Sequence, residues 1–387
     1  MELKDVNHTG EFFVGDVVDF LLRSWRRLLA ASFTGAIIGL TCWYFFGNYS
    51  AEYVLLNSNA SSPVGLDFVS WKVLQKSLPN LAAQIVEEGK TPENQRSLYK
   101  SMSDDGWWKK SVIVGYAISR SDAREFSEVG KELDRPTSSI LNLTLTTMDA
   151  SKQQASENVE SAANFIKSGG AFLQLRTVLG DYESGAIKKE AKIQAKITAT
   201  KLELEYTDNL LKSLEGLQKR YPITSSGNIN QLLNSSNLSG KYMPLTTQII
   251  AINADILDAK ENLLRLQRGK NQQLLVRDFL QRADAIKGQT YDGLILCDQL
   301  LTIENDLRGK LAKDDLSGED VLNDIRTDLL DVKLRFTKGL AASTSPTVVK
   351  KGMFKFIASG LFVAFFLMLA VILVGRVLPG PKRGGAE

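Results

Sequence analysis

Two long apolar segments lie near the ends of the chain, and a region of mixed polarity separates them. Residues 28–46 and 356–374 each contain 19 consecutive residues without a charged side chain. At a rise of 1.5 Å per residue, about 20 residues cross a hydrocarbon core of roughly 30 Å, and buried helices of soluble proteins are usually shorter. The pattern therefore predicts two transmembrane helices around one large extramembrane region.

Basic residues beside the first apolar segment predict its orientation. Three of them precede it, and the next basic residue along the chain is Lys72. Because such residues resist translocation, residues 1–27 are expected in the cytoplasm, and two spans then place residues 375–387 there as well. The central region faces the periplasm in this topology. The basic residues in front of the segment are Arg23, Arg26 and Arg27.

The stretch before the first span is itself patterned. Residues 10–27 alternate apolar and polar positions at helical spacing, which predicts an amphipathic helix along the membrane surface. Trp25, next to the arginines, is typical of a membrane interface. The 27 residues before the first apolar segment are longer than the basic region of a signal peptide, and no small-residue cleavage site follows Phe46. We therefore expect an uncleaved membrane anchor.

Residues 47–148 predict an α+β base next to the membrane. Alternating, β-rich segments indicate strands at 51–56, 111–119 and 139–147. A helix is expected at 68–88, with a break or kink at Pro79.

Residues 149–290 predict a long helical hairpin that projects into the periplasm. Asp149 is a candidate N-cap, Gly169-Gly170 interrupt the first helix, and residues 171–219 then run without proline. After a polar loop at 221–243, Pro244 opens a second long helix. Residues 291–349 are expected to return through short helices and to add a last strand at 332–340.

The two long helices carry matching apolar stripes, as in a coiled coil. A second apolar row on the first helix has no partner in this pairing, and either a third helix of the same chain or self-association could cover it. The second helix contributes Ile249, Ile252, Ile256, Ala259, Leu263 and Leu266, and the first contributes Ile193, Ile197, Leu204, Leu211 and Leu214. The unpartnered row is Leu202, Tyr206, Leu210 and Leu217.

Composition excludes several function classes. Residues 47–349 hold 37 basic and 38 acidic residues, a balance unlike that of a nucleic-acid-binding domain. The single histidine, His8, lies outside this region, and Cys42 and Cys297 are too far apart in the topology to pair. No phosphate-binding loop is present. We therefore expect no catalytic residue, cofactor or metal ion.

Small and aromatic residues supply the candidate contact sites. Gly35 and Gly39 lie four residues apart in the first span, and Gly360 and Ala364 do so in the second. Such faces let helix backbones approach closely, either within one chain or between chains. Trp107 and Trp108 are aromatic candidates for stacking on a glycan; packing inside the base is the alternative.

The order of these features resembles the polysaccharide co-polymerases, the Wzz-type chain-length determinants of O-antigen and related polymers. Only Pro346 precedes the second span, where the family typically has a proline-rich run. The matching segments are Asp16–Arg27, Tyr49–Tyr53, Tyr242–Gln248 and the second span.

This resemblance implies a ring of about eight two-span subunits in the bacterial inner membrane. The ring is expected to work with a membrane polymerase on a lipid-linked glycan of lipopolysaccharide type, in contact with membrane lipids and without a reaction of its own. Arg23, Arg26, Arg27 and Pro346 are then juxtamembrane contact residues. An inner-membrane component of a capsule exporter is the alternative; a two-span sensor and a periplasmic enzyme are disfavoured.

Overall fold

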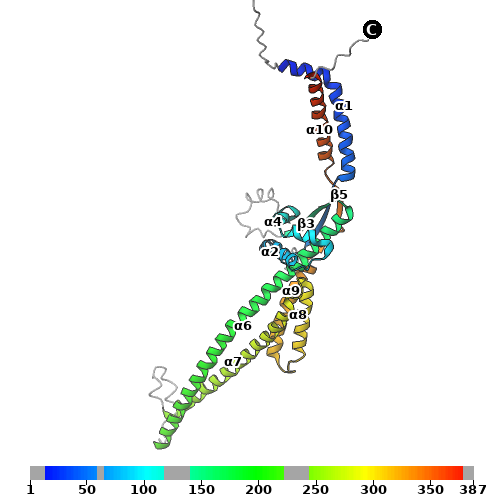
Figure 1. The fold of residues 1–387 in the computed structure, drawn as a ribbon. Helices are drawn as coiled ribbons and strands as arrows, with labels where there is room; N and C mark the ends of the chain where they lie inside the picture. Colours follow the sequence, from blue (N-terminus) through cyan, green and yellow to red (C-terminus); the bar gives the residue numbers. More distant parts are fainter. Residues whose placement is uncertain (1–13, 59–64, 117–139, 222–243, 378–387) are drawn as a thin grey trace, which may run out of the picture.

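The computed structural model describes residues 14–58, 65–116, 140–221 and 244–377. It confirms the expected fold class: two apolar helices at the ends of the chain, a small sheet with short helices, and long central helices (Figure 1). The apolar helices extend from one end of this base, and the long helices extend from the other.

The apolar helices α1 (Val14–Phe46) and α10 (Met353–Val377) pack side by side. Within them, Ser24–Phe46 and Met353–Val374 are long and apolar enough to cross a membrane. The predicted amphipathic helix is not a separate element, because α1 is continuous from Val14, although its first turns bend away from the rest (Figure 1). Residues 1–13 lie outside the described part.

An antiparallel sheet forms the centre of the base. Its central strand β1 pairs with β3 on one side and with β4 and β5 on the other, and β2 lies beyond β3. Because β1 follows α1 and β5 precedes α10, the sheet brings the two ends of the chain together. The strands are β1 (Tyr49–Asn57), β2 (Val112–Tyr116), β3 (Ile140–Asp149), β4 (Leu340–Ala342) and β5 (Thr347–Lys350).

The last strand was predicted in the wrong place. Residues 332–337 belong to helix α9, and the strands β4 and β5 follow it. Val332 and Phe336 are buried four residues apart, which is helical spacing. The strands β4 and β5 are too short for an alternation of apolar and polar residues to be recognised in the sequence.

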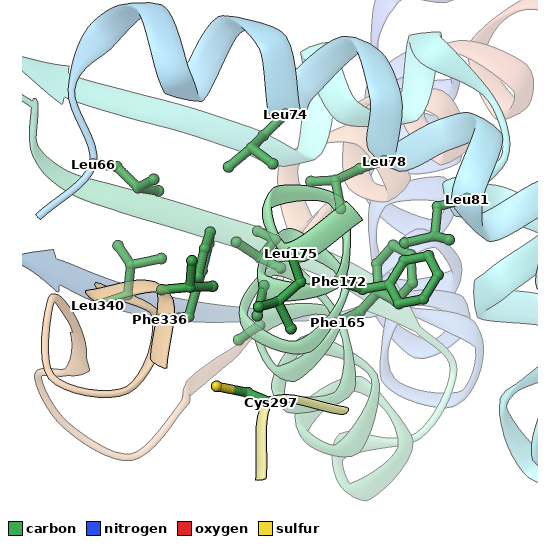
Figure 2. Close-up of a cluster of buried hydrophobic side chains, with 14 of the residues drawn as sticks. Leu66, Leu74, Leu78, Leu81, Phe165, Phe172, Leu175, Cys297, Phe336 and Leu340 are labelled. Atoms are coloured by element: carbon green, nitrogen blue, oxygen red, sulfur yellow. The ribbon is translucent and has the colours of Figure 1, made fainter. Parts of the chain in front are cut away.

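Short helices surround the sheet and share its core. Pro79 does not end α2, which continues through it. Figure 2 shows side chains from α2, α6, α8 and α9 in one cluster, with Leu175 of α6 near its centre and Phe165 beside Leu81 of α2. The helices are α2 (Phe68–Glu87), α3 (Arg96–Met102), α4 (Asp105–Ser111), α8 (Gly293–Arg308) and α9 (Leu316–Thr337). A 3-10 turn, Glu93–Gln95, precedes α3.

Helix α6 (Lys152–Arg220) is continuous for 69 residues, contrary to two expectations. Gly169 and Gly170 do not interrupt it; a Cβ atom added to Gly170 would lie 2.5 Å from the ring of Phe336. The glycines therefore allow close packing. Asp149 is not the N-cap, because Ser151 occupies that position and the Asp149 carboxylate accepts from the amide of Ala150.

Helix α7 (Leu245–Lys287) runs back along α6 (Figure 1). Every residue of the two predicted stripes is buried or half-buried, with Ile197 and Ile256 the most enclosed. The pair thus forms the expected two-helix seam, and the loop predicted at 221–243 lies almost entirely outside the described residues.

Candidate functional site

The paired apolar helices touch through the small residues that the sequence singles out. A Cβ atom added to Gly35 would lie 2.4 Å from both the Ala364 Cβ and the Gly360 carbonyl oxygen. One added to Gly39 would lie 2.4 Å from the carbonyl oxygen of Phe356. These distances leave no space for a side chain. Of the two contacts left open above, this structure contains the one within a single chain.

The junction between these helices and the sheet is fastened by Lys350. Its ammonium group donates to the Tyr44 carbonyl at 2.6 Å and lies 4.9–5.5 Å from the ring centres of Trp43, Tyr44 and Tyr49. The Trp43 indole donates to the Lys351 carbonyl at 3.2 Å. Since cation–π and hydrogen-bonded contacts act together here, the ends of α1 and β5 are held in one arrangement.

The juxtamembrane residues lie at two separate places. Arg26 and Arg27 are exposed near the start of the apolar span Ser24–Phe46, and the Arg26 guanidinium lies 5.8 Å from the ring centre of the half-exposed Trp25. Arg23 is in the same helix, with its side chain outside the described part. Pro346 is half-buried between β4 and β5, at the other end of the apolar helices. The structure therefore does not bring these residues into one site.

Trp108 belongs to the core of the base, which corrects the glycan-stacking expectation for this residue. Trp108 is 1% exposed, and its indole donates to the Met102 carbonyl at 2.6 Å. Trp107 is partly buried against the same core and meets Trp108 edge to face. A buried ring face cannot stack on a sugar, so packing explains Trp108, whereas a glycan contact at Trp107 stays a prediction.

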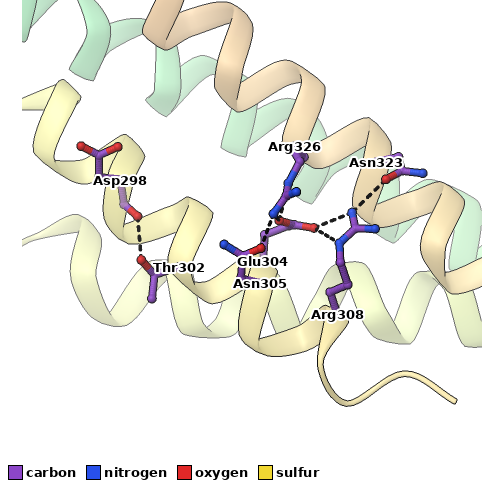
Figure 3. Close-up of polar contacts among 7 residues, drawn as sticks. All are labelled: Asp298, Thr302, Glu304, Asn305, Arg308, Asn323 and Arg326. Carbon is purple, nitrogen blue, oxygen red and sulfur yellow. Dashed lines mark hydrogen bonds and ion pairs between the residues drawn. The ribbon is translucent and has the colours of Figure 1, made fainter. Parts of the chain in front are cut away.

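A buried charge network joins α8 and α9, and sequence reasoning missed it. Glu304 is fully buried, and its carboxylate lies 2.7 Å from Arg308 Nη2 and 2.8 Å from Arg326 Nη2 (Figure 3). Arg308 also donates to Asn323 at 2.9 Å. Glu304 is one of many acidic residues on these charge-rich helices. Only the tertiary contact between α8 and α9 distinguishes Glu304 from its neighbours.

Cys297 and Tyr182 carry reactive groups that are engaged in structural contacts. The Cys297 thiol donates to the Leu329 carbonyl at 3.2 Å, and burial raises the pKa of this thiol to about 11, so it stays protonated. One groove of about 690 Å³ lies between α6, α7 and α9, where Tyr182 donates to Asp328 at 2.7 Å. No cluster of metal-ligating side chains occurs among the described residues.

A polar cluster ties the base to the hairpin. Glu88, just after α2, accepts a hydrogen bond from Tyr291, which precedes α8. Lys90 lies 2.9 Å from the same carboxylate and donates to the Gly288 carbonyl at 3.1 Å. The Tyr291 hydroxyl is the largest cause lowering the pKa of Glu88 to about 2, and the Lys90 ammonium also lowers it.

The fold defines an α+β protein with paired apolar helices at one end and an extended helical hairpin at the other. No protein-family model matches the chain, and no curated protein matches it. A search of solved structures finds a chain described as a full-length bacterial polysaccharide co-polymerase. The alignment covers 95% of this chain and 99% of that chain, with 9% identity and a TM-score of 0.33.

Proposed function

We propose that this chain is a non-catalytic regulator of polysaccharide chain length, for a polymer of O-antigen or lipopolysaccharide type, in the bacterial inner membrane. The observation that carries the proposal is the arrangement of contact surfaces around one base. Close-packed apolar helices are clamped to the sheet at one end, and a long hairpin extends from the other (Figure 1). Such a subunit can hold a scaffold at a fixed height above a membrane.

The proposed orientation follows from charge. Arg26 and Arg27 lie at the start of the apolar span Ser24–Phe46, far from the sheet and about 30 Å from the other end of α1 at 1.5 Å per residue. With this end in the cytoplasm, the base and hairpin face the periplasm and both termini are cytoplasmic. Trp43 and Tyr44 then lie at the periplasmic interface, where aromatic residues are favoured.

The proposed partners are a second copy of the chain, a membrane polymerase and its lipid-linked glycan. A ring of about eight subunits encloses a space next to the membrane in which a growing glycan can be held. The length of product then depends on how long the polymerase stays associated with this scaffold. Neither a cofactor nor nucleic acid takes part.

The test is a gel of surface polysaccharide from the source bacterium with the gene deleted and then restored. We expect deletion to abolish the clustered length distribution while polymer is still made. Wild type and Ala30→Leu, an exposed position on α1, should restore the clustering, because Ala30 faces away from α10. Gly35→Leu should not, because it forces α1 and α10 apart.

Two results would contradict the proposal. An unchanged length distribution after deletion would remove the regulatory role. Loss of all surface polymer, with material trapped inside the cell, would instead favour the capsule-exporter alternative. Immunoblots of each variant establish that the proteins are present at equal amounts.

A further inference from the structure

Both helices of the hairpin carry large apolar side chains that remain exposed outside the seam. The α6 row is Leu202, Tyr206, Leu210 and Leu217, which are 37–72% exposed. The α7 row is Ile250, Leu257 and Leu264, which are 55–67% exposed and repeat every seven residues. A seven-residue repeat keeps one side of a helix, so the α7 row is a continuous stripe. The sequence pattern had indicated only the α6 row.

The two rows lie on opposite sides of the hairpin. Leu210 directly precedes the seam residue Leu211, whereas Leu257 directly follows the seam residue Ile256. One residue turns a helix by about 100°, so the α6 row flanks its seam on the preceding side and the α7 row on the following side. The two helices of an antiparallel pair run in opposite directions, so the flank just before the seam on one helix and the flank just after it on the other face opposite sides of the hairpin.

The rows also lie at similar heights along the hairpin. A Cβ atom on Gly269 would lie 3.4 Å from Ile193 Cδ1, which fixes the register of α6 and α7. Counting 13 residues from this contact in opposite directions leads to Tyr206 on α6 and Ile256 on α7, so Tyr206 and Leu257 differ in height by one residue, about 1.5 Å.

Some residues in and beside the two rows lie within one residue of the same height and are complementary. A bulky apolar side chain corresponds in height to a small or aromatic one, and an acidic side chain corresponds to a basic one. Glu203 and Lys260 are both exposed and form no ion pair within the described residues. These pairs are Ala199 with Leu264, Glu203 with Lys260, Tyr206 with Leu257 and Ser213 with Ile250.

We infer that the α6 row of one copy packs against the α7 row of the next copy, at similar height, in a head-to-tail contact. Such a contact uses two different surfaces of each subunit, so it continues from copy to copy and closes into a ring when the rotation permits. The inference rests on the proposed function, because anchoring in one membrane makes neighbouring copies parallel and level. The occupant of each row is therefore a second copy of this chain.

Disulfide cross-linking in membranes tests this contact. The full-length chain carries Cys42→Ala and Cys297→Ser, which remove the native thiols. Tyr206→Cys and Leu257→Cys are placed on separately tagged copies and co-expressed. We expect a cross-linked dimer containing both tags, and no dimer from either variant expressed alone. A single copy with both substitutions should give a ladder of multimers.

The matched control uses Lys212→Cys with Ala251→Cys. These exposed residues lie at similar heights, but each is on the flank of its own helix opposite to the row, so no ladder is expected. A ladder from this control as strong as that from the test pair would overturn the inference. A dimer from Tyr206→Cys alone would do so too, because it shows a symmetric contact.

Charge reversal provides a second readout without cysteines. Glu203→Lys is expected to reduce the oligomeric fraction measured by mass photometry roughly twofold, a typical effect for one exposed pair, and Lys260→Glu should restore it. If the protein is oligomeric but shows neither cross-linking nor charge rescue, the inferred contact is wrong. The rows are then covered by another partner, either residues 222–243 or a second protein. A monomeric wild-type protein would overturn both this contact and the oligomeric scaffold of the proposed function.

Discussion

The two halves of α6 have different surroundings, although they form one helix. From Ala155 to Leu179 the helix crosses the base and is buried against the sheet, α2, α8 and α9. Beyond this region, only Ile197 and Thr200 of the described helix are buried. The base therefore has a core of its own, whereas the hairpin has a single seam and large exposed apolar rows. A helix pair of this kind depends on further contacts for much of its stability.

The largest expected effect breaks the base. Phe336 of α9 is fully buried against Gly170 of α6, and Phe336→Ala would leave a cavity. We expect a loss of about 3–5 kcal/mol in the free energy of unfolding. Thermal unfolding in detergent measures it. Leu330→Ala on the same helix is the control, because Leu330 is 39% exposed and should cost much less.

Breaking the charge network contrasts a buried ion pair with an exposed one. Glu304→Ala leaves Arg308 and Arg326 without their carboxylate, and we expect a loss of about 2–3 kcal/mol because the arginines remain partly exposed. Glu261→Ala removes the exposed pair with Arg265 on the hairpin and should cost less than about 1 kcal/mol. Equal losses in urea titrations would show that burial of Glu304 does not matter.

Two adjacent residues sharpen the difference within the hairpin. Ile256 is 4% exposed in the seam, whereas Leu257 is 67% exposed. Ile256→Ala should destabilise the hairpin by about 2 kcal/mol and leave the base intact, because the seam does not reach it. Leu257→Ala should change hairpin stability by less than about 0.5 kcal/mol. Hydrogen exchange resolved by segment separates the two regions, and faster exchange in the base would contradict this expectation.

The smallest effect concerns the link between the two regions and depends on pH. The pKa of Glu88 is lowered to about 2, so its contribution is fully present above its unfolded value near 4.5 and is lost as the pH falls towards 2. The difference in melting temperature between wild type and Glu88→Gln should therefore shrink over that range. A difference that stays constant would show that the ionised carboxylate does not hold Tyr291 and Lys90.

Sequence patterns were reliable where a regular repeat was long. The strands β1 and β3 and the seam of α6 and α7 were located correctly because each repeats one spacing, and the apolar helices because each contains a long run without charge. Errors occurred where local and tertiary effects compete. Gly169-Gly170 were interpreted as a break because glycine weakens an isolated helix, but the packed base compensates for that loss.

For the candidate contact residues too, the sequence identified the positions, and the tertiary structure decided what each one contacts. Gly35, Gly39, Gly360 and Ala364 could be selected from their spacing, but whether they meet in one chain required the positions of both helices. Trp108 was recognisable as an aromatic candidate, and only its burial separates packing from binding. The role of these residues in an assembly stays a prediction.

The sequence alone determined which segments are apolar, which helices are long and which stripe faces a partner, because these follow from composition and period. The tertiary structure decided which surfaces remain available. Burial depends on contacts between residues far apart in the chain, as for Glu304 with Arg326 and Trp108 with Met102. The contact between Ile193 of α6 and Gly269 of α7 likewise sets the register of the hairpin, which brings the two exposed rows to similar heights on its opposite sides.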